Sequence, residues 1–290
     1  MDLGRATGLK PGDVIVAVDG GEVAALVRGW TSYYSASNEP TVLRDIGRSI
    51  TRGDCAKPAV LGVRRGNETL ELTAPRVPWD KLDSTTFQSH DLAGETFRLL
   101  SRDVAYLKLS SVKAAEVAHY IDLAAGTKGL IIDIRNYPAE FVAYALGQLL
   151  VGKPTEFVRF THADLTNPGA FHWGGPKRLE PQKPRYSGKV VILLDEVSQS
   201  QSEFTAMAFR SARGALVVGS TTAGADGNPS AIPLPCTLMN TQFSGIGVFY
   251  PDKKPTQRIG IVPDVEVKPT IAGIRAGRDE VLDAALRLIR

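Results

Sequence analysis

The chain has 290 residues, 43% of them hydrophobic, and a formal net charge of +3. This length is typical of one large or two ordinary domains with sizeable cores. Lys and Arg are mixed with Asp and Glu along the chain, which argues against nucleic-acid binding, and no apolar run approaches the roughly 18 residues that a membrane span requires.

The two cysteines, Cys55 and Cys236, lie far apart and show no metal-ligand spacing. We therefore expect two unpaired thiols, and the sequence indicates neither a metal nor another cofactor. The opening residues, MDLGRATGLKPGD, lack the basic region followed by an apolar region that marks a secretory signal peptide.

The first 77 residues are predicted to form a small β domain. Turn signals at Pro11-Gly12 and Asp19-Gly20 enclose an apolar run that predicts a buried strand. The expected elements are, in order, a strand at Val14–Val18, a helix around Val42–Ile50, and a hairpin of Ala59–Arg64 and Glu68–Ala74. The following proline-containing segment, Val77–Thr86, predicts a linker.

From residue 96 onward, apolar strands alternate with helices, which predicts an α/β core with mostly parallel pairing. The expected strands are Val104–Leu109, Gly129–Ile134, Val190–Leu194 and Ala215–Gly219, and the expected helices cover Val112–Ala124, Ala139–Val151, the residues from Phe204 and Asp279–Ile289. Lys153–Lys189 is predicted to be a long irregular loop of the kind that forms lids. Short β segments such as Gly245–Tyr250 are expected after Ser230.

The stretch VVILLDEVSQSQSEFTAMA, residues 190–208, predicts a buried strand, a polar turn and a helix. Ser200 and Glu203 have the spacing of a capping box, so Ser200 is explained as an ordinary helix cap. The alternative is a nucleophile at a helix start, where N–H groups stabilise the charge that develops in acyl transfer. The second explanation requires a base nearby.

Four motifs occur in order behind the β domain: GLIIDIRN (129–136), SQSQSE (198–203), ALVVGSTTAG (215–224) and GIVPD (260–264). Together they resemble the C-terminal processing (tail-specific) proteases and the related tricorn core. The resemblance implies a crotonase/Clp-protease-like spiral of ββα units and serine peptidase activity on protein or peptide substrates. It also implies a location outside the cytoplasm, with any export signal lost if the start is truncated.

The same resemblance extends to the N-terminal segment, where GLKPGDVIVAVDGGEV resembles the middle of a PDZ domain. Residues 1–7 are too few for the first PDZ strand and the carboxylate-binding loop, which suggests a truncated start. The predicted organisation is therefore a partial PDZ-like domain at 1–77, a linker at 78–95 and a catalytic core at 96–290.

By this resemblance the nucleophile is Ser200, and the N–H of Gln201 is one oxyanion donor. The family takes its second donor from a glycine-rich turn, which here is Arg135-Asn136-Tyr137-Pro138-Ala139 and has no glycine. Because Pro138 has no N–H, either Tyr137 or Ala139 has to donate.

The general base is not at its family position. The lysine that follows the Thr-x-Gly turn is replaced by Ala225, and the next family glutamine aligns with Pro229. The tricorn histidine and glutamate align with Lys108 and Gln257. Two candidates remain. One is Lys108, whose alternative explanation is a lysine that extends into solvent at a strand end. The other is Asp226, whose alternative explanation is an ordinary turn aspartate.

The histidines His119, His162 and His172 are more simply explained as surface residues, although His172, beside Trp173, is positioned to enter the site from a lid. Two other functions stay open. One is a non-catalytic peptide-binding scaffold that kept the fold without a base. The other is a crotonase-like acyl-CoA enzyme, since fold alone does not fix chemistry.

Overall fold

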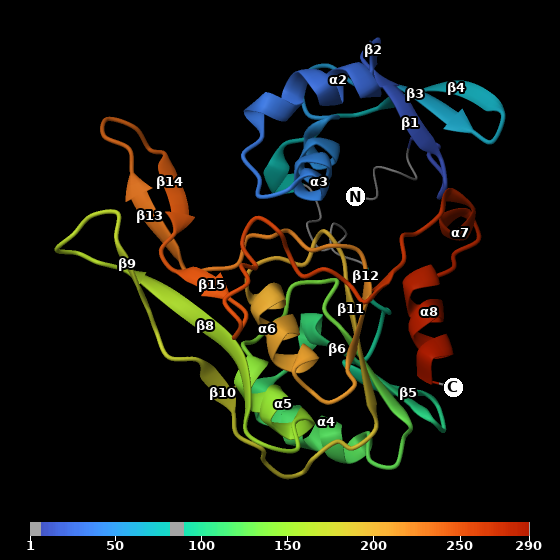
Figure 1. The fold of residues 1–290 in the computed structure, drawn as a ribbon. Helices are drawn as coiled ribbons and strands as arrows, with labels where there is room; N and C mark the ends of the chain where they lie inside the picture. The colour runs from blue at the N-terminus through green and yellow to red at the C-terminus, as the bar shows by residue number, and fades with distance from the viewer. Residues whose placement is uncertain (1–6, 82–89, 290) are drawn as a thin grey trace.

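The computed structural model describes residues 7–81 and 90–289 (Figure 1). Its N-terminal part is a four-stranded antiparallel sheet in the order β2-β1-β3-β4. Its elements are β1 (Val14–Val18), β2 (Gly21–Glu22), α2 (Val23–Trp30), α3 (Glu39–Ser49), β3 (Ala59–Arg65) and β4 (Glu68–Ala74). The predicted strand, helix and hairpin are confirmed, whereas α2 was not expected. Part of the predicted linker lies outside the described residues, and the PDZ assignment stays a prediction.

The central feature is a six-stranded sheet in the order β16-β12-β11-β7-β6-β5, parallel except for the β5–β6 pair. Its strands are β5 (Phe97–Ser101), β6 (Val104–Lys108), β7 (Gly129–Asp133), β11 (Lys189–Leu194), β12 (Leu216–Gly219) and β16 (Val265–Glu266). Helices connect these strands as the alternating pattern predicts, so the α/β fold class is confirmed.

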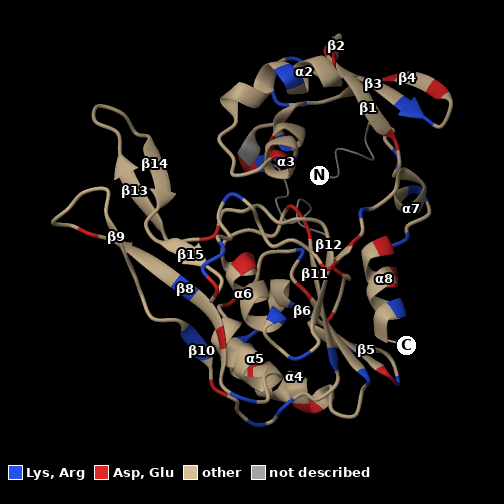
Figure 2. Ribbon diagram, in the orientation of Figure 1, with Lys and Arg blue, Asp and Glu red and all other residues tan. Residues whose placement is uncertain are grey.

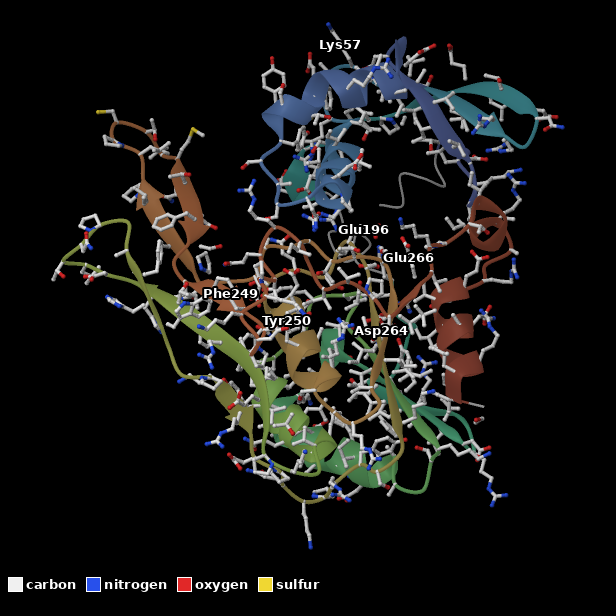
Figure 3. The ribbon with its side chains drawn as sticks, viewed as in Figure 1. Lys57, Glu196, Phe249, Tyr250, Asp264 and Glu266 are labelled. Atoms are coloured by element: carbon white, nitrogen blue, oxygen red, sulfur yellow. The ribbon has the colours of Figure 1, made fainter. Side chains whose placement is uncertain are left out.

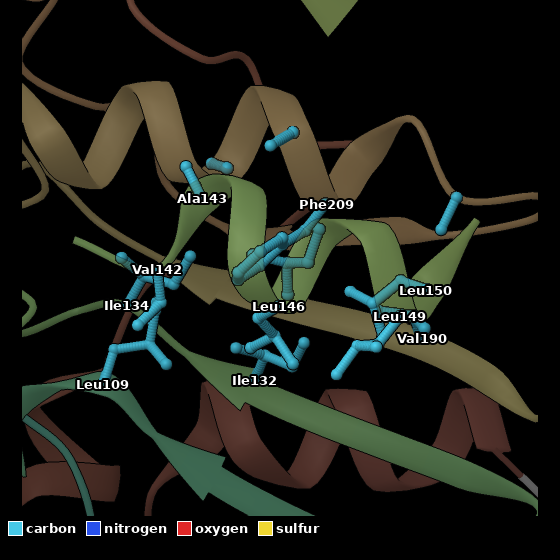
Figure 4. Packing of buried hydrophobic residues seen from close by; sticks show 14 of the residues in the cluster. Leu109, Ile132, Ile134, Val142, Ala143, Leu146, Leu149, Leu150, Val190 and Phe209 are labelled. Atoms are coloured by element: carbon cyan, nitrogen blue, oxygen red, sulfur yellow. The ribbon is translucent and has the colours of Figure 1, made fainter. Parts of the chain in front are cut away.

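Helices cover both faces of this sheet, which explains its unbroken apolar strands. Along β11, Ile192 and Leu194 pack into the cluster shared with α4, α5 and α6, while Val191 and Leu193 pack against α8. The helices are α4 (Val117–Leu123), preceded by a 3₁₀ turn at Ala114–Glu116, α5 (Ala143–Leu150), α6 (Gln201–Arg210), α7 (Ile271–Arg275) and α8 (Glu280–Ile289). Figure 4 shows α5 lying on the sheet, with Leu146 above Ile132.

The predicted loop at Lys153–Lys189 is wrong: the segment contains β8 (Thr155–Ala163), β9 (Phe171–Trp173) and β10 (Lys177–Leu179). β8 pairs with β9, β10 and β15 (Gly247–Phe249) in an antiparallel arrangement. Its aromatic side chains pack on the start of α6, with Phe160 stacked on Phe204 at 6.1 Å. A second hairpin, β13 (Pro229–Pro233) with β14 (Asn240–Ser244), projects beside β9 (Figure 1).

Both cysteines are free and exposed, as expected. Lys and Arg are interspersed with Asp and Glu over the ribbon (Figure 2). None of the described helices combines the length and apolarity needed to cross a bilayer. The described residues also hold no group of three or more His, Cys, Asp or Glu side chains placed to bind a metal.

Candidate active site

Ser200 lies between β11 and α6, as the N-cap residue of the helix, with φ 55° and ψ −115°. An ordinary N-cap residue has extended backbone geometry, and positive φ is uncommon for a residue with a Cβ. Such strain persists only where the surroundings enforce it, and it concentrates at functional sites. The strand–turn–helix placement of a strained serine matches the nucleophile elbow of α/β-hydrolases in geometry. Ser200 therefore differs from a simple cap.

Glu203 enforces this conformation. The Ser200 N–H donates to its carboxylate at 3.0 Å, and the predicted capping box of Ser200 and Glu203 is confirmed. Three further donors reach the same carboxylate from the loop after β12: the Thr222 hydroxyl at 2.5 Å, the Gly224 N–H at 2.7 Å and the Ala225 N–H at 3.0 Å. Glu203 is fully buried, and these four donors match the lone-pair capacity of its two oxygens. It ties the Ser200 turn to the 222–225 loop.

Asp226 is the next residue of that loop, and it is nearly fully buried. Its Oδ1 accepts from the Gly227 N–H at 2.7 Å, whereas its buried Oδ2 has no hydrogen-bond partner in the described structure. Burial, followed by the nearby charge of Glu203, raises the pKa of Asp226 to about 7. Asp226 thus combines an unused acceptor oxygen with a pKa suited to proton transfer at neutral pH, which an ordinary turn aspartate does not have.

The two oxyanion donors considered above have different surroundings. Gln201 is the first residue of α6, where the N–H has no acceptor within the helix. In the other turn the Ala139 N–H donates to the Leu109 carbonyl at 2.8 Å, so this donor is already committed. Tyr137 remains as the alternative. The Gln201 side chain donates to the Glu140 carbonyl at 3.0 Å and links the two turns.

A buried ion-pair network on the α8 face holds the Arg135 turn. The Arg135 guanidinium donates to Asp133 Oδ2 at 2.6 Å and to Asp279 Oδ2 at 2.7 Å. The Tyr106 hydroxyl donates to the same Asp133 oxygen at 2.8 Å. Every carboxylate oxygen of this network has a partner, so the network positions the turn and leaves no acceptor free.

Lys108 also lies on the α8 face, because it alternates with Val104 and Tyr106 along β6. Its ammonium donates to the Leu92 carbonyl at 3.1 Å and lies 3.9 Å from Asp91 Oδ1. The explanation that Lys108 extends into solvent is wrong, since the residue is buried. Among the described residues, its hydrogen bonds and ion pairs do not include Ser200, and its role as a base stays an untested prediction.

One histidine contact was not expected from the sequence. His90 Nδ1 lies 2.7 Å from Asp195 Oδ2, and this hydrogen bond raises the pKa of His90. No sequence signal joins the two residues, which are 105 positions apart. His172 is exposed on β9 and pairs with Asp164 at 2.9 Å. The Gln257 amide donates to the Asp226 carbonyl at 2.7 Å.

The N-terminal region contacts the loops on either side of Ser200 through α3, and Glu196 lies below this helix in Figure 3. Arg44 donates to the Glu196 carbonyl at 2.8 Å and to the Gln199 side chain at 3.1 Å. Asn38, the N-cap of α3, donates to the Thr222 carbonyl at 2.8 Å. These contacts could not be predicted from the sequence, because they join segments more than 150 residues apart.

The assembled site contains a half-buried serine at a helix N-terminus, a buried acceptor oxygen on the adjoining loop and two turns that carry backbone N–H groups. These are the elements of acyl transfer: a nucleophile, a proton acceptor and donors for an oxyanion. No imidazole, amine or carboxylate hydrogen-bonds the Ser200 hydroxyl within the described residues. Any proton transfer in this site would therefore need a closer approach when substrate binds.

The fold of the chain is similar to those of solved structures. The chain is similar over 67% of its length to a putative peptidase from Parabacteroides merdae ATCC 43184, with 23% identity and a TM-score of 0.60, and it spans 63% of that protein. It is similar over 98% of its length to mature CPAF complexed with lactacystin, with 16% identity, 78% of that chain covered and a TM-score of 0.75.

At these identities the structures show a shared fold. No curated protein matches the chain. The profile of peptidase family S41 matches residues 103–267, which is more than half of the chain and includes Ser200, Asp226 and Gln257. The resemblance inferred from the four motifs is thereby confirmed, and the chain belongs to peptidase family S41.

Proposed function

We propose that the protein is a serine-type peptidase that hydrolyses protein or peptide substrates with Ser200 as its nucleophile. The observation that carries the proposal is the strained backbone of Ser200, enforced by Glu203 at the start of α6. A cap needs no such strain, whereas a nucleophile held at a sharp strand-to-helix turn does. Membership of a peptidase family supports the same chemistry.

The proposed reaction assigns one role to each group. Ser200 Oγ attacks the scissile carbonyl while its proton passes to the free Oδ2 of Asp226, and the Gln201 N–H and the Tyr137 N–H hold the oxyanion. Asp226 then gives the proton to the leaving amine, and the C–N bond breaks. Water attacks the acyl-enzyme in the second half-reaction and gives a proton to Asp226. Asp226 passes this proton to Ser200 Oγ as the bond between Oγ and the acyl carbon breaks and the carboxylic acid leaves.

The test is hydrolysis of unfolded casein by the purified chain and by the Ser200→Ala variant. Wild-type protein should release peptides and the variant should not, with unchanged circular dichroism. Since the base must be deprotonated, kcat/KM should rise with pH through about 7, the value to which burial raises the pKa of Asp226. Equal hydrolysis by both proteins would contradict the proposal.

A second candidate is the peptide-binding scaffold. The observation that favours it is Ala225 at the family's lysine position, together with a Ser200 hydroxyl that contacts no side-chain base in the described chain. A well-folded wild-type protein that binds unfolded casein without cleaving it would support this candidate.

A further inference from the structure

A cavity of about 550 Å³ lies between the β8–β9 hairpin and β15. Aromatic rings form one wall: Trp173 and Phe249 make an edge-to-face pair with centroids 4.7 Å apart, and Phe171 is largely exposed beside them. Figure 3 labels Phe249 at the junction of β15 and β8. Single exposed apolar residues are normal, but aromatic side chains that gather in a concave wall mark a binding site.

Two residues that line the cavity are hydrogen-bonded to the proposed catalytic loop. Gln257 lines it, and the Gln257 amide donates to the Asp226 carbonyl at 2.7 Å and to the Ile246 carbonyl at 2.9 Å. Arg258 also lines it, and its N–H donates to the Gly224 carbonyl at 2.6 Å. Gln257 and Arg258 therefore connect the cavity wall directly to the loop that carries Asp226 and binds Glu203.

The charged residues around the cavity restrict which kind of peptide side chain can bind in it. Lys253 Nζ lies 4.9 Å from the centre of the Trp173 ring, and Arg258 is exposed at the rim. Two cations disfavour a lysine or arginine side chain there. An aromatic side chain instead gains edge-to-face contacts with the exposed rings.

We propose that this cavity is a specificity subsite that receives an aromatic side chain of the peptide substrate, with Trp173 as its main contact. This assignment rests on the proposed function, because it treats the bound peptide as a substrate of Ser200. It specifies which class of substrate side chain the site prefers. Trp173 and Phe171 lie in the segment that the sequence predicted as a lid; they act here as a fixed wall on β9.

The test separates binding from cleavage by using the Ser200→Ala chain. Its affinity is measured for capped octapeptides of Gly, Ala and Ser that carry one phenylalanine at each position in turn, against the all-alanine parent. At least one phenylalanine peptide should bind about tenfold more tightly than the parent, which is the range of an aromatic contact. Adding Trp173→Ala should remove that difference.

Phe243→Ala is the matched control, since Phe243 is exposed on the neighbouring β14 and does not line the cavity. It should keep the tenfold preference. Equal affinity for all peptides, loss of the preference in the Phe243 variant alone, or a change of oligomeric state in the Trp173 variant would overturn the proposal. Aromatic preference in binding without any hydrolysis by wild type would overturn the proposed function and leave the subsite standing.

Discussion

Two polar clusters lie near the carboxyl ends of the central strands, one on each face of the sheet. They differ in whether their buried charged groups have hydrogen-bond and ion-pair partners. On the α8 face, Arg135 forms ion pairs with both Asp133 and Asp279, and every oxygen of these two carboxylates is hydrogen-bonded. On the α6 face, Glu203 holds a strained Ser200, and Asp226 keeps a buried oxygen without a partner in the described structure. The first cluster contains more charge, but only the second contains strain and an unused acceptor.

Buried charge alone therefore does not identify the site. A fully paired cluster fixes geometry, because each group already has the partner that its burial demands. An unpaired carboxyl oxygen beside a second carboxylate destabilises the folded chain, and a position of this kind points to function. We expect that removing the unpaired acid, Asp226, raises the stability of the folded chain, whereas removing the paired cation, Arg135, lowers it.

The largest contrast is expected for Asp226→Asn. In wild type the folded pKa of about 7 exceeds the ordinary value of 3.8, so the folded state holds a proton that the unfolded state has lost. The contribution of Asp226 to the free energy of unfolding is therefore fully present below pH 4 and is lost as the pH rises to about 7. The variant should be more stable than wild type by about 4 kcal/mol at pH 8 and nearly equal at pH 4, while activity falls by about 10² or more.

Urea unfolding at both pH values, with casein hydrolysis, checks this prediction. Asp103→Asn is the control, because Asp103 is half-exposed in a surface ion pair, and it should change neither quantity. If Asp226→Asn destabilises the chain at pH 8, the description of Asp226 as an unsatisfied buried acid is wrong.

Arg135→Met should have the opposite effect. Removing the cation leaves Asp133 and Asp279 without their ion-pair partner, and breaking a buried ion pair typically costs about 3–5 kcal/mol. The free energy of unfolding measured in urea should fall by that amount, whereas Arg178→Met, an exposed residue on β10, should be neutral. A loss below about 1 kcal/mol would mean that the paired cluster does not stabilise the fold as proposed.

Glu203→Gln tests the connection between strain and activity. Glutamine offers one acceptor oxygen in place of two, so some of the four donors around it lose their partner, at about 1–3 kcal/mol each. We expect a comparable loss of stability and a large loss of casein hydrolysis, since Ser200 can relax. Glu266 is exposed on β16, so the Glu266→Gln variant serves as the control. Unchanged activity in a destabilised variant would show that the strain at Ser200 serves no catalytic purpose.

Arg44→Ala should have the smallest effect. It removes the hydrogen bonds from α3 to the Glu196 carbonyl and the Gln199 side chain, which predicts a loss of about 1–2 kcal/mol and a fewfold fall in kcat at constant KM. The Arg28→Ala variant, which alters an exposed residue of α2, is the comparison. An unchanged kcat would show that the N-terminal region does not position the Ser200 turn.

The sequence was informative where local pattern decides structure. The apolar run ending at Leu194 and the Ser200–Glu203 spacing predicted β11, the turn and the start of α6. It failed at Lys153–Lys189, where Pro and Gly suggested a loop although β8 pairs with three distant strands. Turn residues do not reveal pairing with strands remote in sequence.

The chemistry of the site could be predicted only in part from the sequence, for a related reason. The positive φ of Ser200 results from tertiary contacts of Glu203 with residues 222–225, and no propensity encodes it. Likewise, Asp226 was a candidate from its place in the loop, but its missing partner appears only in three dimensions. His90 and Asp195 illustrate the same limit for a pair that no motif connects.

The most direct measurement is covalent labelling with a fluorophosphonate probe, which reacts with activated serines, followed by mapping of the modified residue by mass spectrometry. The account predicts a single adduct on Ser200, faster labelling above pH 7 than below it, and none in the Ser200→Ala chain. An unlabelled, fully folded wild type, or an adduct on another serine, would contradict it.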